Sequence, residues 1–226
     1  MPLRSRTPRD TVHHPLFARF YARFSVSADR RAGVAAHRAE LLAGLSGRVV
    51  EIGAGNGLNF AHYPEAVSEV VAVEPERTLR QLAVRSAMNA TVPVDVLPGT
   101  AEDLPVPSGT FDAAVVSLVL CSVRDLPGAV AEIGRVLRPG GELRFFEHVP
   151  ARGRAMAAAQ RTLDRTVWPR LFGGCHTARD ATAAIAAAGF ELGPYRRLTV
   201  PESGLQLPSS PCVLGRARWP EAPGPS

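Results

Sequence analysis

The stretch Val49-Val-Glu-Ile-Gly-Ala-Gly-Asn-Gly57 decides the fold of this chain. A β-branched run leads directly into three alternate glycines, which can adopt positive φ and let a ligand lie against the backbone. A dinucleotide-binding turn with the spacing G-x-G-x-x-G would need its third glycine where this chain has Leu58. Glu51 stands two residues before the first glycine, and its carboxylate would repel a pyrophosphate but not a cation. The loop therefore predicts a ligand that carries a positive charge.

Short apolar runs and helical patterns alternate on both sides of this stretch. Strands are expected at 48–52, 70–73, 92–97, 111–117, 142–149, 190–200 and 212–219. Helices are expected at 58–63, 76–89, 126–137, 152–168 and 178–188. A turn at Pro139-Gly140-Gly141 is expected before the fifth strand. Alternation of this kind predicts an α/β fold with a doubly wound, mostly parallel seven-stranded sheet and helices on both faces.

The N-terminal part has a different pattern, and we expect residues 1–45 to form a tail and a helical cap on the α/β domain of residues 46–226. Helical patterns cover 15–45, with a second helix expected over 28–45. One apolar stripe on the first helix is formed by Phe17, Phe20, Tyr21 and Phe24. Two interpretations stay open for this stripe, packing in the core or a lid over a ligand pocket.

Composition excludes several classes of enzyme. The 226 residues contain 26 basic side chains, all of them arginines, and the net charge is +5. Without lysine the chain cannot form a Schiff base, which excludes pyridoxal phosphate enzymes and lysine aldolases. It also lacks the lysine of P-loop proteins and protein kinases. The arginines are scattered rather than clustered, so the pI of 9.8 does not by itself indicate nucleic-acid binding.

Cysteine spacing and hydropathy give expectations about metal sites and location. Cys121, Cys175 and Cys212 are far apart and odd in number, so neither a disulfide framework nor a metal site is expected. The longest apolar run, 113–123, is too short to span a bilayer, and the first residues do not form a secretory signal. We expect a soluble, cytoplasmic protein without a membrane span, whose oligomeric state stays open.

Two further acidic positions follow expected strands and describe the ligand more fully. Glu74 ends the second strand, where an acid accepts hydrogen bonds from both hydroxyls of a ribose. Glu102 and Asp103 follow the third strand and either contact the ligand or cap the next element. A ribose, a base and a cationic end without a phosphate together indicate S-adenosylmethionine.

Four segments carry a resemblance to a known family. They are VVEIGAGNG at 49–57, VVAVEPE at 70–76, GTAEDLPVPSGTFDAAVVS at 99–117 and RVLRPGGELRFFEH at 135–148. In this order, over about 100 residues, they resemble the class I S-adenosylmethionine-dependent methyltransferases. The resemblance implies S-adenosylmethionine as the cofactor and methyl transfer as the activity.

The resemblance assigns cofactor-binding roles to Glu51, Gly53, Ala54, Gly55, Glu74, Pro75, Ala101, Glu102 and Ser117. It implies that the glycine backbone lies under the methionine part of the cofactor, and that Glu51 lies close to its ammonium group, directly or through water. Glu74 is implied to bind the ribose. Glu102 is implied to lie near the adenine edge, with Ala101 alongside, and Ser117 next to the methyl group.

A finer resemblance rests on LVLCSV at 118–123, FEHV at 146–149 and GCHTARD at 174–180. These segments are similar to a small methyltransferase-like family that includes alkyl thiol S-methyltransferases. The similarity implies a small-molecule methyl acceptor, with a thiol as one candidate. Quinone and phospholipid methyltransferases stay open as alternatives. A nucleic-acid methyltransferase is less favoured, because the segment after residue 117 lacks the paired prolines of amino-group base methylases, so no nucleic-acid partner is expected.

The acceptor is expected at the carboxyl edge of the sheet. A thiol only has to lose a proton with a pKa of about 8.5, whereas a hydroxyl or carbon acceptor needs a base. His148 ends the fifth strand and is the candidate catalytic base, while Glu147 is expected to face away from it. The expected pocket residues are Phe17, Tyr21, Leu118, His148 and His176. Cys121 and Cys175 are expected to be small buried side chains.

Overall fold

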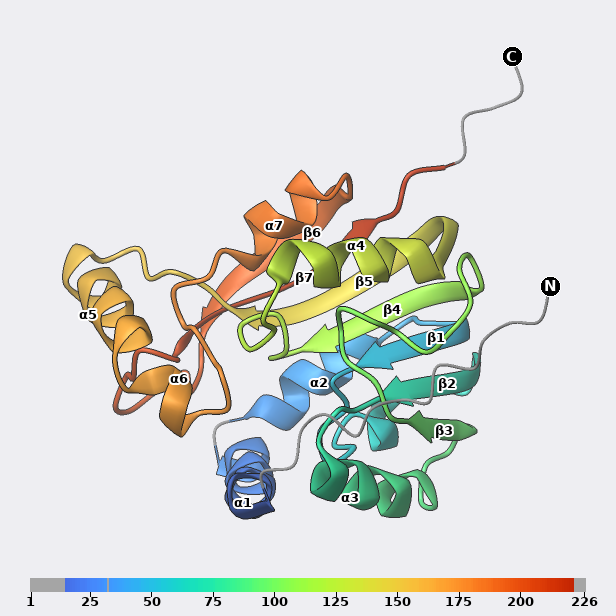
Figure 1. Ribbon diagram of the computed structural model, residues 1–226, viewed down its shortest axis with the longest axis horizontal. Helices are drawn as coiled ribbons and strands as arrows, with labels where there is room; N and C mark the ends of the chain where they lie inside the picture. The colour runs from blue at the N-terminus through green and yellow to red at the C-terminus, as the bar shows by residue number, and fades with distance from the viewer. Residues whose placement is uncertain (1–14, 32, 222–226) are drawn as a thin grey trace.

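A computed structural model describes residues 15–31 and 33–221 of the chain (Figure 1). Its centre is a seven-stranded sheet with the order β3-β2-β1-β4-β5-β7-β6. The strands are β1 (Gly47–Ile52), β2 (Val67–Val73), β3 (Val94–Leu97), β4 (Phe111–Ser117), β5 (Leu137–His148), β6 (Glu191–Thr199) and β7 (Pro211–Arg218). Strands β1 to β5 pair in parallel, and β7 is antiparallel to both of its neighbours. The expected doubly wound, mostly parallel sheet is confirmed.

Helices cover both faces of this sheet (Figure 1). They are α1 (Pro15–Arg31), α2 (Val34–Leu42), the 3-10 turn η1 (Phe60–His62), α3 (Arg77–Ala87), α4 (Leu126–Val136), α5 (Arg154–Arg165), α6 (Trp168–Leu171) and α7 (Ala181–Ala187). Neighbouring residues of β1 point to opposite faces: Val50 joins the core cluster with α4 and α7, and Val49 joins the cluster with α2 and α3. Two layers of apolar side chains therefore hold the sheet between the helices.

Carboxylates fix the start of three helices. Glu76, Asp125 and Asp180 accept hydrogen bonds from backbone N–H groups in the first turns of α3, α4 and α7, at 2.7, 3.1 and 3.0 Å. Each such cap contributes about 1 kcal/mol by satisfying an N–H group that has no partner inside the helix. These helices consequently begin at fixed positions beside the carboxyl ends of the strands.

Several expected boundaries are wrong, and the helix expected over 58–63 is only the 3-10 turn Phe60–His62. The expected turn at Pro139-Gly140-Gly141 lies inside β5: Phe111 pairs with Leu137 and Ala113 already pairs with Glu142, so this segment is an irregularity in the strand. The helix expected over 28–45 begins only at Val34, because α1 continues to Arg31. The helix expected over 152–168 is divided into α5 and α6.

The strands β1, β2, β4 and β5 end at one edge of the sheet, on the side of the molecule where α1, α5 and α6 lie (Figure 1). Loops from these strand ends therefore converge there, as in other open parallel sheets. No helix within the described ranges combines the length and apolar character that crossing a membrane requires.

Candidate active site

The loop after β1 is held in left-handed conformations. Gly53, Gly55 and Gly57 have φ values of +67°, +58° and +79°. The N–H groups of Gly53 and Ala54 both donate to the carbonyl oxygen of Val73, at 2.7 and 3.2 Å, so the loop is fixed to the end of β2. A Cβ atom on Gly53 would lie 2.6 Å from the side chain of Val119. The glycine at 53 is thus required by packing as well as by its backbone conformation.

Glu74 connects the glycine loop to the end of β2. Its Oε2 accepts the N–H of Gly55 and its Oε1 accepts the N–H of Glu76, both at 2.8 Å. The side chain is buried, and burial raises the pKa of this carboxyl to about 7 although both N–H groups oppose the shift. Each carboxylate oxygen has a second lone pair. Glu74 can therefore hold the loop and still accept a hydrogen bond from a bound hydroxyl.

Glu51 is the centre of a buried polar network. Its Oε1 accepts from Nδ2 of Asn59 at 2.9 Å, and its Oε2 accepts from the hydroxyl of Tyr63 at 2.8 Å. Nη1 of Arg38 donates to Asn59 at 2.8 Å and to Oγ of Ser117 at 3.2 Å. Burial raises the pKa of Glu51 to about 7. A contact of Glu51 with a cofactor ammonium group stays a prediction. In such a contact, the ammonium group would bind carboxylate oxygens that already accept from Asn59 and Tyr63.

Arg38, Asn59 and Tyr63 were missed by the sequence reasoning. Arg38 lies on α2, and its Nε also donates to Asp29 of α1 at 2.8 Å, so it joins α1 to the end of β4. The only signal in the sequence was the polar character of these residues within apolar segments. Such a signal does not reveal which polar groups meet.

The remaining expected cofactor residues lie on the loops after β2, β3 and β4. Pro75 directly follows Glu74, and its carbonyl oxygen accepts from Arg80 at 3.1 Å. Ala101 is buried in the core cluster. Oε1 of Glu102 accepts the N–H groups of Arg124 and Asp125 at 2.9 and 3.3 Å, which ties the loop after β3 to the start of α4. The position of Glu102 beside the adenine edge stays a prediction.

Helix α1 lies over the glycine loop. Cε1 of Tyr21 is 3.7 Å from the position of a Cβ on Gly55. Burial raises the pKa of the Tyr21 hydroxyl to about 12. The charge of Arg38 lowers this pKa, whereas Glu74, Cys121 and Cys175 raise it further. Phe20 and Phe24 stack on each other with 6.0 Å between ring centroids, and they are 55% and 50% exposed. These two rings are therefore not core residues; the side chain of Phe17 lies outside the described part of the chain.

The turn after β4 is strained and firmly held. Leu118 has a φ of +60°, which is unusual for a residue with a side chain. Its N–H donates to the carbonyl oxygen of Phe146 at 2.7 Å. Oε1 of Glu147 accepts the N–H groups of Val119 and Leu120 at 2.8 and 3.0 Å. Glu147 is fully buried, so it faces away from solvent and holds this turn in place.

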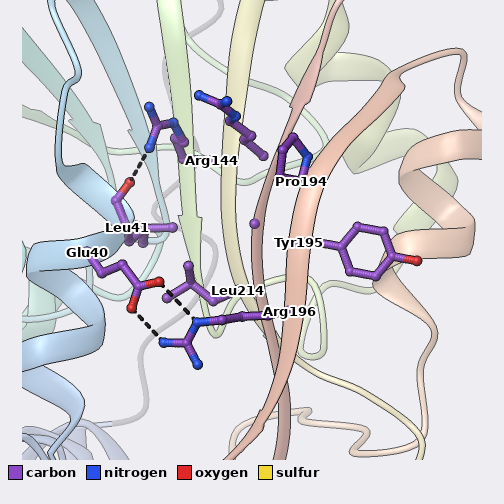
Figure 2. A pocket seen from close by; sticks show the side chains of 9 residues that line it. Glu40, Leu41, Arg144, Pro194, Tyr195, Arg196 and Leu214 are labelled. Carbon is purple, nitrogen blue, oxygen red and sulfur yellow. Dashed lines mark hydrogen bonds and ion pairs between the residues drawn. The ribbon is translucent and has the colours of Figure 1, made fainter.

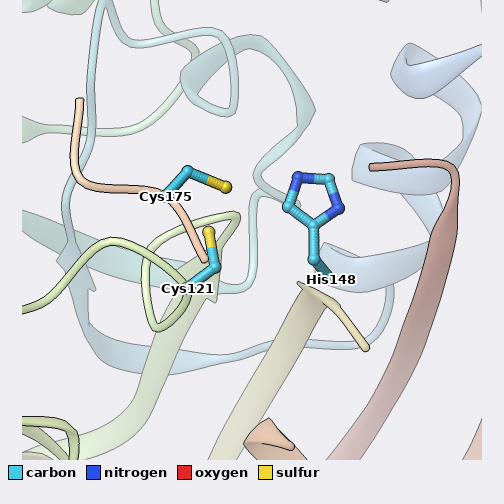
Figure 3. Close-up of side chains that lie close together, drawn as sticks. All are labelled: Cys121, His148 and Cys175. Carbon is cyan, nitrogen blue, oxygen red and sulfur yellow. The ribbon is translucent and has the colours of Figure 1, made fainter. Parts of the chain in front are cut away.

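Three residues from distant segments meet at the ends of β4 and β5 (Figure 3). The possible ligand atoms of Cys121, His148 and Cys175 all lie within 4.8 Å of one another. Nδ1 of His148 lies 3.4 Å from Sγ of Cys212, and Figure 3 shows the other ring nitrogen facing Cys175. Cysteines that are far apart in the sequence therefore lie close together in the structure, because folding joins the segments that carry them.

The surroundings of Cys175 and His148 shift the pKa values of both side chains. The hydrogen bond from Cys121 lowers the pKa of the Cys175 thiol to about 5, against the effect of burial. Burial alone would lower the pKa of His148, but hydrogen bonds with Cys175 and Cys212 outweigh it and raise the value to about 10. His148 is thus a partner of sulfur atoms rather than an isolated base. His176 is adjacent, and its Nδ1 lies 2.7 Å from the carbonyl oxygen of Gly174.

A model of the methyltransferase domain family matches residues 50–145. The chain is also 30% identical to human thiol S-methyltransferase TMT1A over 198 residues, which covers 83% of this chain and 80% of that protein. The chain belongs to the class I S-adenosylmethionine-dependent methyltransferases. The family expected from the four segments is confirmed, and S-adenosylmethionine is the cofactor of this methyltransferase.

Two further similarities agree with this assignment. The methyltransferase is 34% identical over 179 residues to the ubiquinone/menaquinone biosynthesis C-methyltransferase UbiE of Syntrophotalea carbinolica, over 74% of this chain and 73% of that protein. A crystal structure of a SAM-dependent methyltransferase from Thermotoga maritima has a TM-score of 0.64 at 23% identity, and covers 90% of this chain and 98% of its own. That structure shows the shared fold.

The residues of the methyltransferase fit its cofactor. Bound S-adenosylmethionine supplies an electrophilic methyl group on a sulfonium ion. Glu74 keeps lone pairs for ribose hydroxyls, and the carboxylates of Glu51 and Glu74 favour a cation over a phosphate. The backbone at Gly55 is free of close side chains except Tyr21. That the cofactor lies on this loop, beside Tyr21 of α1, stays a prediction.

A hollow in the surface of the methyltransferase lies apart from these residues (Figure 2). It is a groove between α2 and strands β5, β7 and β6. Arg196 and Glu40 form an ion pair of 2.6 Å at its side, and Nη1 of Arg144 donates to the carbonyl oxygen of Leu41 at 3.3 Å. None of its lining residues belongs to the glycine loop or to the cysteine–histidine group.

Proposed function

We propose that this methyltransferase transfers the methyl group of S-adenosylmethionine to the sulfur of a small thiol. The similarity to thiol S-methyltransferases supports this acceptor, because it covers 83% of the chain and extends well beyond the domain at residues 50–145. The thiol S-methyltransferases TMT1B of mouse and rat are 34% and 32% identical to this chain.

The surroundings of His148 favour a thiol acceptor over a carbon or hydroxyl acceptor. One ring nitrogen lies 3.4 Å from Cys212, and the other faces Cys175 (Figure 3). Both nitrogens therefore have sulfur partners, and neither is left to remove a proton from an acceptor. A thiol does not need such a base, since its own pKa is about 8.5. A phenol, quinol or carbon acid would need one.

Positioning then supplies most of the catalysis. Holding a nucleophile in line with the methyl group contributes about 7–11 kcal/mol to lowering the barrier when water is excluded. Tyr21 on α1 and Val119 in the turn after β4 lie next to the glycine loop. These side chains are uncharged, which suits an apolar thiol better than a nucleic acid.

The test is an acceptor screen with methyl-deuterated S-adenosylmethionine, in which thiols, phenols, quinols and RNA are offered separately and products are identified by mass spectrometry. We expect labelled thioethers from the thiols only. The Glu74→Ala variant is the control for activity at this site. Labelled quinols or phenols with unreactive thiols would overturn the proposal and favour the quinone alternative, which the 34% identity to UbiE supports.

A further inference from the structure

One group of side chains in the described part of the chain has the composition and spacing of a metal site. It consists of Sγ of Cys121, a ring nitrogen of His148 and Sγ of Cys175, all within 4.8 Å of one another. Two sulfur ligands on tetrahedral zinc lie about 3.8 Å apart, given Zn–S bonds of about 2.3 Å. Small side-chain movements would therefore bring the three ligands to a common ion.

We propose that Cys121, His148 and Cys175 bind one Zn²⁺ ion, and that the fourth position of the ion takes the sulfur of the acceptor. The first part stands on the geometry of the group alone. The second part rests on the proposed thiol methyltransferase activity.

The ligand set agrees with this metal. Two thiolates and a neutral imidazole are soft to borderline ligands that suit zinc, and the two negative charges balance the charge of Zn²⁺ in a largely buried place. Three protein ligands with an open fourth position are typical of catalytic zinc, whereas structural sites have four. Cys212 is not the fourth ligand in this arrangement, because it lies on the opposite ring nitrogen of His148.

The scaffold fixes the ligands as metal sites require. The N–H of His176 donates to the carbonyl oxygen of Cys121 at 2.8 Å, and this bond places Cys175 beside Cys121. Nη1 of Arg179 donates to the carbonyl oxygen of Leu120 at 3.2 Å, which ties the same two segments a second time. The contact between Nδ1 of His148 and Cys212 orients the imidazole ring. Partners of this kind set the direction of the ligating nitrogen.

The site lies beside the glycine loop. Val119, two positions before Cys121, packs against Gly53, and the hydroxyl of Tyr21 is within electrostatic reach of Cys121, Cys175 and Glu74. A thiol bound to zinc at this place loses its proton to solvent, because coordination deprotonates thiols outright. The thiolate sulfur then bonds to the methyl carbon of the cofactor. The bond from that carbon to the sulfonium breaks, and its electron pair stays on the cofactor sulfur.

The first experiment measures metal binding by the reduced full-length protein in the absence of acceptor. Titration with Co²⁺ should give one bound ion, with sulfur-to-cobalt charge-transfer absorption and tetrahedral visible bands, and Zn²⁺ should displace it. Cys121→Ser and Cys175→Ser should lose the charge-transfer absorption. His62→Ala, a histidine outside the group, should bind as wild type does, and Cys212→Ala should bind more weakly by about tenfold.

Circular dichroism shows whether each variant is folded, and the wild-type titration does not depend on any variant. Absence of tetrahedral cobalt binding in the wild type would overturn the metal site. A Cys121–Cys175 disulfide that forms in the presence of equimolar Zn²⁺ would also overturn the metal site, since both cysteines are free in this structure. Either result would leave the proposed methyl transfer to thiols standing.

The second experiment tests the open position. Ethanethiol added to the cobalt-loaded protein should shift the visible bands and add charge-transfer intensity, whereas ethanol, its oxygen analogue, should not. An unchanged spectrum at thiol concentrations that support methylation would overturn the role of the ion in acceptor binding. If cobalt binds but no thiol is methylated in the screen, the proposed function fails and the acceptor role fails with it, while the metal site itself remains.

Discussion

The backbone N–H of His176 donates a 2.8 Å hydrogen bond to the carbonyl oxygen of Cys121. The two residues belong to two different loops, one after β4 and one after α6. Asp164 of α5 holds the second loop from its other side by accepting the N–H groups of Thr177 and Ala178, at 2.9 and 2.8 Å. The region around Cys121 and His176 is thus held by α5 as well as by the sheet.

Glu74 is expected to supply much of the affinity for the cofactor. Glu74→Ala removes the charged acceptor of the ribose hydroxyls and the partner of the Gly55 N–H. We expect calorimetry to show binding of S-adenosylmethionine weakened by more than about tenfold, or about 1.4 kcal/mol. Glu65→Gln removes one negative charge from an exposed position and should bind normally. Unchanged affinity of Glu74→Ala would remove this residue from the site.

Gly55→Ala separates backbone strain from cofactor contact. Gly55 has a φ of +58°, and Gly44, an exposed residue after α2, has a φ of +75°. A side chain in this conformation costs about 1 kcal/mol at either position. Urea unfolding should therefore show similar losses of stability for Gly55→Ala and Gly44→Ala, but only Gly55→Ala should weaken cofactor binding. Equal cofactor affinity in the two variants would show that the ligand does not lie on this loop.

Tyr21 is expected to control access to the glycine loop. Tyr21→Ala should open the space above Gly55, so that stopped-flow fluorescence shows faster association and faster dissociation of the cofactor. Phe24→Ala is the matched control, because Phe24 lies on the same helix but is 50% exposed. If Phe24→Ala changes both rates as much as Tyr21→Ala, the effect comes from the stability of α1 and not from a lid.

Stability should fall as the pH rises toward neutrality. Burial raises the pKa of Glu51, Glu74 and Glu147 from 4.5 to about 7 in the folded protein. Between these two values the folded state holds protons that the unfolded chain has released, so the free energy of unfolding decreases with pH in that window and levels off above it.

Glu51→Gln tests this pH dependence. The amide is isosteric: its oxygen can accept from Asn59 and its NH₂ group can donate to the hydroxyl of Tyr63, while one of the three raised carboxyl groups is removed. The variant should gain stability over the wild type above about pH 7, and this gain should vanish below about pH 5. Thermal unfolding at both ends of the window measures the difference. A stability difference that does not vary with pH would contradict the assignment of a raised pKa to Glu51.

The sequence by itself determined the fold class and the position of the glycine loop. The β-branched run at 49–52 and the alternate glycines are local patterns, and local patterns report strand geometry and positive φ directly. The acids at the strand ends could be located for the same reason, since parallel strands bring their carboxyl ends to one edge. The irregular segment in β5 was not predictable, because a glycine pair after a proline is also the pattern of a turn.

Only the tertiary structure decided which side chains meet. Glu51, Asn59 and Arg38 form one network because α2 packs against β5 and η1, and no spacing along the chain encodes that contact. Cys121, His148 and Cys175 come together because β4 and β5 are neighbours in the sheet and the segment after α6 returns to the same edge. Sequence separation says nothing about such groups, since packing of distant elements sets the distances between them.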